Sequence, residues 1–233
     1  MNNYQTIEMR PDFYIEVLPH ARGFTLSDHE KRLVDNLWND EEAERTSHLH
    51  NGQILNVVSV EPNKLVGEFI EYKYYIAQLR DPNFEEVLKI KTLAISGITT
   101  IADKILVGQR SSHVTAYKNY YELVPSGGID PGSQVGNRIN IARQFEIELW
   151  EETGISVTEI KSIRPKALIY DKENKTYEIC AEINVNYTIL KEPLAASEEY
   201  PKLQWISKRD IQDFVSKHES EFVPFSLYLL QLR

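Results

Sequence analysis

The 233-residue sequence predicts an α+β protein, because residues 1–90 combine strand-like and helix-like segments and the pattern becomes strand-heavy from Lys91. Two apolar runs, Thr92–Ile101 and Lys104–Arg110, stand on either side of Ala102-Asp103 and predict a β-hairpin. Between Gly127 and Ile155, a glycine pair is followed by a helix-like segment that carries three closely spaced glutamates. These observations together favour a sheet with helices packed against it.

The N-terminal part has a helix and strands of its own, so we expect residues 1–90 to form a small α+β subdomain and residues 91–233 to form the main domain. Ser27 and Glu30 match an S-x-x-E capping box, and the apolar residues that follow recur at helical spacing. This pattern predicts a helix that ends near Glu44. The other elements expected here are strands at 13–18 and 54–60, an extended or mixed segment at 65–75, and a short helix at 84–89 after a hinge at 81–83.

The C-terminal part predicts further strands and a last helix. We expect strands at 166–171, 176–186 and 187–190, and then a strand that leads into a helix capped by Ser207. Cys180 lies within an apolar strand-like run, which indicates a small buried hydrophobe and not a nucleophile.

The net charge is −9, because 35 acidic residues outnumber 26 basic ones. Such a balance disfavours a broad surface for nucleic acid or for an anionic membrane. The N-terminus lacks the basic and apolar regions of a signal peptide, and no apolar run approaches the ~20 residues of a spanning helix. The single cysteine excludes an internal disulfide framework. These features predict a cytoplasmic protein.

Glu148, Glu151 and Glu152 carry the clearest chemical signal in the chain. On a helix they fall within an arc of about 100°, where like charges cost roughly a few tenths of a kcal/mol each unless a cation lies among them. A hard divalent cation such as Mg²⁺ prefers carboxylate oxygens as ligands. The alternative interpretation is a solvated acidic stripe on the helix surface.

The segment from Gly128 to Ile155 resembles the Nudix box, whose pattern is G-x5-E-x7-R-E-U-x-E-E-x-G-U with U aliphatic. The second half of the pattern is matched by Glu148, Leu149, Glu151, Glu152, Gly154 and Ile155. The strand that ends at Arg110, the run that starts at Glu122 and the run that starts at Leu203 resemble the family's flanking elements. The resemblance implies a Nudix-type α/β/α sandwich with a mixed sheet, to which the N-terminal α+β subdomain is an extension.

The first half of the pattern is not matched. Gln134 stands where the pattern has glutamate, the spacing to the helix is about five residues longer, and Ile147 stands at the arginine position. An inserted loop explains the spacing, because loop length costs little. The family's arginine buttresses a catalytic carboxylate, and Arg143, one helical turn earlier, is the candidate substitute. The alternative is that Arg143 is a solvated helix residue.

The resemblance implies roles for further residues. Glu148, Glu151 and Glu152 would hold Mg²⁺ or Mn²⁺, with Glu148 either a ligand or the group that orients the attacking water. Gly127 and Gly128 would let the backbone approach the metal or the substrate phosphates, the alternative being a plain turn. Arg110 would neutralise a phosphate or merely end its strand at the surface. The family often adds a carboxylate outside the box, for which the candidates are Glu178, Glu182, Glu198 and Glu199.

The activity implied is hydrolysis of the pyrophosphate bond in a nucleoside diphosphate that is linked to another moiety. The appended N-terminal unit and the interrupted box resemble the branch that hydrolyses UDP-sugars to UMP and sugar 1-phosphate. The alternative is a Nudix-fold module that has lost catalysis and binds a nucleotide or a protein. A small nucleotide is the expected partner, without nucleic acid or membrane, and a homodimer is a further expectation.

Overall fold

The computed structural model describes residues 3–43, 50–114, 116–186 and 194–232. The chain divides into two compact units that alternate along the sequence. Unit 1 consists of Met1–Ala94, Gly128–Asn140 and Leu168–Glu178, and unit 2 of Ile95–Gly127, Ile141–Ala167 and Ile179–Arg233. The first junction falls close to residue 90, whereas two segments of the predicted main domain belong to unit 1. As a statement about folding domains, the division at residue 90 stays a prediction.

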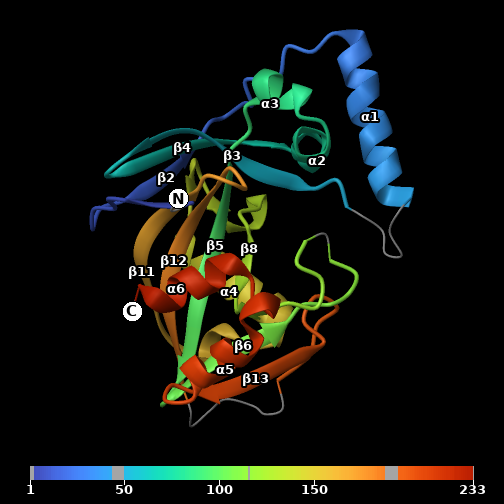
Figure 1. The fold of residues 1–233 in the computed structure, drawn as a ribbon. Helices are drawn as coiled ribbons and strands as arrows, with labels where there is room; N and C mark the ends of the chain where they lie inside the picture. The colour runs from blue at the N-terminus through green and yellow to red at the C-terminus, as the bar shows by residue number, and fades with distance from the viewer. Residues whose placement is uncertain (1–2, 44–49, 115, 187–193, 233) are drawn as a thin grey trace. The chain divides into compact units, whose positions relative to one another are not determined.

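Unit 1 combines short strands with helices from the N-terminal part of the chain (Figure 1). Its strands are β1 (Tyr4–Ile7), β2 (Tyr14–Val17), β3 (Gln53–Glu61), β4 (Lys64–Glu71), β9 (Gln134–Val135) and β10 (Arg138–Ile139). Its helices are α1 (Asp28–Ala43), α2 (Tyr72–Arg80), α3 (Asn83–Leu88) and the 3-10 turn η1 (Pro131–Ser133). Three long strands, β5 (Thr92–Ile101), β11 (Ile160–Asp171) and β12 (Thr176–Val185), contribute residues to both units.

The sheet of unit 1 is mixed. β3 and β4 form an antiparallel hairpin with a bulge between Val57 and Ser59, whereas β2 runs parallel to β4. β10 pairs antiparallel with β2, so that Ile139 lies opposite Ile15. The segment between the glycine pair and the acidic helix, predicted as an inserted loop, therefore forms two short strands of this sheet.

The helices of unit 1 share one apolar core with the sheet. Its buried members are Leu26, Val34, Ile70, Ala77, Phe84, Leu88 and Ile90. The capping box that starts α1 is confirmed, because the Glu30 backbone N–H donates to Ser27 Oγ at 3.2 Å and the Ser27 N–H donates to Glu30 Oε2 at 2.7 Å. Of residues 65–75, predicted as extended or mixed, those up to Glu71 belong to β4, and α2 begins at Tyr72.

Unit 2 carries the acidic helix and the C-terminal elements. Its strands are β6 (Lys104–Gln109), β7 (Tyr121–Leu123), the start of β8 (Ser126–Gly128) and β13 (Lys202–Ser207). Its helices are α4 (Ile141–Thr153), α5 (Ile211–His218) and α6 (Pro224–Gln231), with 3-10 turns η2 (Val157–Glu159) and η3 (Glu219–Glu221). The α+β class and the mixed sheet predicted from the sequence are confirmed.

β6 pairs with three other strands in unit 2. It forms the predicted hairpin with β5, with Ile101 opposite Lys104, and it also pairs antiparallel with β7 and β13. Gly108 on β6 accommodates the ring of Tyr200, because a Cβ at Gly108 would lie 2.5 Å from that ring's Cδ1. The core of the unit includes Ile95, Ile105, Leu106, Val107, Phe145, Leu149, Ile179, Ile183 and Phe222.

Two predicted boundaries near the C-terminal end change. α5 begins at Ile211 with Asp210 at its N-cap, so the prediction that Ser207 caps this helix is wrong. The physical reason is a turn between strand and helix, in which the Asp210 N–H donates to the Ser207 carbonyl at 2.9 Å. β11 begins at Ile160, six residues before the predicted 166. The strand predicted at 187–190 lies outside the described residues.

Two simpler expectations can also be compared with the structure. Among the described residues, no helix has the length and apolarity that crossing a membrane requires. Cys180 is only 6% exposed, which confirms its interpretation as a buried small hydrophobe.

Candidate active site

Helix α4 is anchored in the core by a buried face that carries Glu152 beside its apolar residues. Phe145 and Leu149, four residues apart, are fully buried. The helix stops at Gly154, whose φ of 73° is the left-handed conformation that favours glycine after a helix C-terminus. The Gly154 N–H donates to the Trp150 carbonyl at 2.8 Å. This anchoring fixes which side of α4 faces the strands.

Glu152 is the most deeply buried of the three glutamates, with 2% of its surface exposed. The backbone N–H of Ser126 lies 3.3 Å from both of its carboxylate oxygens. Burial raises the pKa of Glu152 well above its ordinary value, and the negative charges of Glu199, Glu148 and Glu122 raise it further. The Ser126 hydrogen bond opposes this shift. Glu152 is therefore a buried carboxyl in a locally acidic environment.

Glu148 is half-buried and packs against Gly127. A Cβ on Gly127 would lie 2.5 Å from Glu148 Cδ and Oε2, so the carboxylate occupies space that only glycine leaves open. From the other side, Gln144 Nε2 donates a hydrogen bond to Glu148 Oε1 at 2.8 Å. Gln144 is itself fully buried on α4.

Glu151 and Arg143 both lie on the exposed part of α4. The Glu148 carboxylate accepts a hydrogen bond from Gln144, which lies next to Arg143 on the helix. Ile147, at the arginine position of the motif, is half-buried. The roles of Arg143 as a buttress and of Glu151 as a ligand stay predictions.

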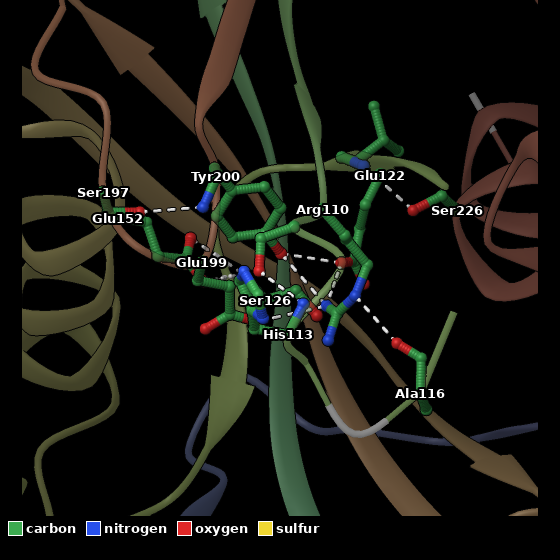
Figure 2. A network of polar contacts seen from close by, with 12 residues as sticks. Arg110, His113, Ala116, Glu122, Ser126, Glu152, Ser197, Glu199, Tyr200 and Ser226 are labelled. Atoms are coloured by element: carbon green, nitrogen blue, oxygen red, sulfur yellow. Dashed lines mark hydrogen bonds and ion pairs between the residues drawn. The ribbon is translucent and has the colours of Figure 1, made fainter. Parts of the chain in front are cut away.

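Arg110 is the centre of a polar network (Figure 2). Its guanidinium forms ion pairs with Glu122 and, at 3.2 Å, with Glu199, and its Nε donates to the Ala116 carbonyl at 3.2 Å. Only 13% of the side chain is exposed, so the interpretation that Arg110 ends its strand at the surface is wrong. Burial alone would lower the pKa of Arg110, but its anionic neighbours outweigh burial and raise it. The substrate-binding role of Arg110 stays a prediction.

Tyr200 completes this network. Its ring is fully buried, and its hydroxyl donates to Glu122 Oε2 at 2.6 Å. Burial raises the pKa of Tyr200 well above its ordinary value, and Glu122, Glu152 and Glu199 add to the shift. The phenol therefore keeps its proton and acts as a donor to Glu122.

Glu199 is the carboxylate outside the motif that the structure brings to Glu152. Burial raises the pKa of Glu199, Arg110 opposes the shift, and Glu122 adds to it. The Ser111 N–H donates to the Glu199 carbonyl at 2.7 Å and holds this segment against the end of β6. Of the other predicted candidates, Glu198 is exposed, Glu182 pairs with Lys166 at 3.1 Å, and Glu178 belongs to unit 1.

The donor set fits a hard divalent cation in its chemistry. Glu148, Glu152 and Glu199 offer carboxylate oxygens, which a hard cation prefers as ligands. Within the described ranges, however, no three acidic, histidine or cysteine side chains already converge as ligands of one ion. The mutual repulsion of these carboxylates is what a cation would relieve.

Gly128 and Gln134, two other motif positions, belong to unit 1. A Cβ on Gly128 would have no atom within 4 Å, unlike one on Gly127, so the two glycines differ in what they require. Gln134 Nε2 donates to the Gly136 carbonyl at 2.8 Å. A role for Gly128 in substrate binding stays a prediction.

Four residues of this site were not singled out by the sequence: Glu122 as part of the charge network, Tyr200, Ser126 and Gln144. Gln144 could have been found, because it stands four residues before Glu148 and thus on the same helix face. Tyr200 and Ser126 could not, since their contacts join segments 78 and 26 residues apart along the chain.

No protein-family model matches the sequence, and a search of characterised proteins finds no match. Solved structures do match this chain, at low sequence identity. A protein from Deinococcus radiodurans is 13% identical over 70% of this chain and 88% of its own, with a TM-score of 0.47. A Nudix hydrolase from Nitrosomonas europaea is 16% identical over 60% and 86%, with a TM-score of 0.41.

A third match is a bifunctional NMN adenylyltransferase/ADP-ribose pyrophosphatase from Francisella tularensis, in complex with AMP and a Mn ion. It is 15% identical over 75% of this chain and 54% of its own, with a TM-score of 0.45. The matched structures thus include a Nudix hydrolase, a member of the family whose motif the chain resembles. The assignment of function rests on the chain's own residues.

Proposed function

We propose that this chain is a Nudix hydrolase that cleaves the pyrophosphate bond of a nucleoside diphosphate linked to another moiety. The observation that supports it best is the buried Glu152 on α4, whose pKa is raised by burial and then by Glu199, Glu148 and Glu122. A buried cluster of carboxylates is costly unless it serves a function or binds a cation. Glu152 also matches the second half of the Nudix motif, so the sequence and the structure support the same site.

Glu148, Glu152 and Glu199 are the residues that would hold Mg²⁺ or Mn²⁺, with Glu151 as an exposed further donor. When bound, such an ion polarises the substrate's phosphates and offsets the charge that develops during displacement. The chain itself orients these groups: the Ser126 N–H holds Glu152, and Gln144 holds Glu148. Glu148 is also a candidate to orient the attacking water.

Arg110 and Tyr200 position the carboxylate outside the motif. Arg110 forms ion pairs with Glu199 and Glu122, and the Tyr200 hydroxyl donates a further hydrogen bond to Glu122. Because Arg110 forms ion pairs with Glu199 and Glu122, we assign it to holding Glu199 near Glu152.

The finer substrate assignment is a UDP-sugar, which would yield UMP and a sugar 1-phosphate. Support for it is limited to the appended N-terminal unit and the interrupted motif. UDP-sugars are therefore the first compounds to assay, beside ADP-ribose and dinucleoside polyphosphates. A homodimer and a cytoplasmic location are further proposals, which size-exclusion chromatography and cell fractionation would test.

The test is product release from a panel of nucleoside diphosphate compounds with Mg²⁺ or Mn²⁺, for wild type, Glu152→Gln, Glu199→Gln and Glu198→Gln. Glu198 is the matched control, because it is an exposed glutamate next to Glu199. We expect metal-dependent turnover in wild type and Glu198→Gln, and a loss of about 100-fold or more in the other two variants. If wild type turned over none of the compounds faster than Glu152→Gln does, the proposed enzymatic activity would be rejected.

The second candidate is a binding module without catalysis. Ile147 at the arginine position and Gln134 at the first glutamate position favour it. In that case calorimetry would detect metal-dependent binding of a nucleotide, while the same panel would show no turnover.

A further inference from the structure

We propose that Gln144 is a positioning residue that holds the Glu148 carboxylate in one orientation from within the helix. The proposal rests on the function proposed above, since it concerns one of that site's acids. Gln144 Nε2 donates to Glu148 Oε1 at 2.8 Å, and the two residues are four positions apart on α4. The motif alone does not point to Gln144, because its pattern leaves that position open.

The Glu148 carboxylate is enclosed from two directions. Gly127 lies so close that an added Cβ would be 2.5 Å from Cδ and 2.7 Å from Oε1. The Gln144 amide approaches the same Oε1 from the preceding helical turn. The close backbone of Gly127 and the buried amide of Gln144 together restrict the rotamers of Glu148.

Gln144 is suited to this task by its burial. It is 0% exposed, so its side chain cannot exchange the bond to Glu148 for one to water without moving out of the core. Its amide is neutral, so it fixes the carboxylate without neutralising it. Groups that orient a ligating carboxylate in this way typically change metal affinity or activity by about 10–100-fold when removed.

A purely structural role for Gln144 predicts something different. In that case the buried glutamine would do no more than satisfy its own polar atoms, as Gln78 does in unit 1. Gln78 Nε2 donates to the Ile90 carbonyl at 2.9 Å and its Oε1 accepts from the Ile90 N–H at 2.7 Å. Loss of such a residue lowers stability without altering chemistry. Gln78→Met is therefore the matched control for Gln144→Met.

The experiment is a double-mutant cycle of Gln144→Met and Glu148→Gln, with Gln78→Met and Gln144→Glu beside it. For each protein we would measure kcat and KM on the best substrate of the panel, Mn²⁺ affinity by electron paramagnetic resonance of the free ion, and Tm. Gln144→Glu keeps the size of the side chain but removes the amide donor; Gln144→Asn, whose amide is one methylene farther from Glu148, serves with the same expected losses if methionine prevents folding.

We expect Gln144→Met to lower kcat about 10–100-fold and to weaken Mn²⁺ binding about 10-fold, with KM for the nucleotide changed less than about threefold. Gln144→Glu, which turns a second carboxylate toward Glu148, should lose at least as much. In the Glu148→Gln background, Gln144→Met should have no further effect, because Gln144 acts through Glu148. Gln78→Met should lower Tm alone.

Two results would overturn the proposal: a Gln144→Met protein that loses only Tm, as Gln78→Met does, or losses that multiply in the double mutant. If wild type turns over no compound, but Gln144→Met still weakens Mn²⁺ binding in a manner that vanishes with Glu148→Gln, the positioning role stands and the proposed activity fails. Absence of Mn²⁺ binding by wild type would overturn both.

Discussion

Replacing Gly127 by alanine should displace the Glu148 carboxylate while leaving the fold intact. The added methyl group would lie 2.5 Å from Glu148 Cδ and Oε2 and 2.7 Å from Oε1. Favourable contacts between such atoms are about 3.5–4.0 Å long, so the carboxylate must move by about 1 Å. The obstructing atoms are the end of a flexible side chain and not backbone, so a rotamer change of Glu148 relieves the overlap.

The expected cost in stability is small. Gly127 is not among the residues with positive φ, so alanine is compatible with its backbone. A compatible replacement of glycine by alanine stabilises by about 0.4–1 kcal/mol through the unfolded chain. A strained Glu148 rotamer costs about 0.5–1.5 kcal/mol. The two effects nearly cancel, and Tm should change by less than about 4 °C.

The expected cost in activity is large. Misplacing a catalytic group by about 1 Å can lower the rate about 100-fold, which corresponds to about 2.7 kcal/mol of transition-state stabilisation. The assay is kcat/KM on the best compound of the panel, with Tm measured on the same preparation. Gly128→Ala separates this steric effect from a general loss of glycine, because its Cβ would meet no atom within 4 Å. A Gly127→Ala protein with wild-type Tm and wild-type kcat/KM would refute the placement of Glu148 in the chemistry.

Three further predictions concern the networks around the site and in unit 1. Tyr200→Phe leaves the buried Glu122 without its 2.6 Å donor, so the free energy of unfolding measured in urea should fall by about 1–3 kcal/mol; an unchanged midpoint would contradict this. Arg110→Met removes the cation paired with Glu199 and Glu122, and should lower both Tm and metal-dependent turnover; a loss of Tm alone would show that Arg110 is only structural. Burial would raise the pKa of Glu68, but hydrogen bonds from its neighbours outweigh burial and lower it, so its contribution to stability is present above about pH 4.5 and is lost as pH falls further. From pH 6 to 3, the free energy of unfolding should therefore fall less in Glu68→Gln than in wild type, and parallel curves would contradict the assignment.

The elements that depend on local patterns were predictable from the sequence. The capping box at Ser27 and Glu30 predicted the start of α1, and the two apolar runs beside Ala102-Asp103 predicted the β5–β6 hairpin. The spacing of Glu148 and Glu152 placed both on one face of a helix, and the structure shows them coupled by charge. In each case the signal lies within about one or two turns of chain.

What could not be predicted depends on contacts that are distant along the chain. Glu122, Tyr200 and Arg110 come together from three segments, and nothing near any one of them in the sequence specifies the others. Likewise, no local signal indicates that Ile139 pairs with Ile15, which makes strands of what the motif's spacing indicated as an inserted loop. Gln144 is a different case, since helical spacing alone could have directed attention to it instead of to Arg143.

The alternation of the two units along the chain has a practical consequence for dissecting the protein. The polypeptide passes between them after residues 94, 127, 140, 167 and 178, so no single cut separates one unit from the other. A fragment that starts at residue 91 would lack β2, and β10, which would keep only β9 as a neighbour, would become a sheet edge open to self-association. Truncation is thus a poor way to determine which unit carries a given function. Co-expressed fragments or point substitutions keep every strand with its partner and are the sounder choice.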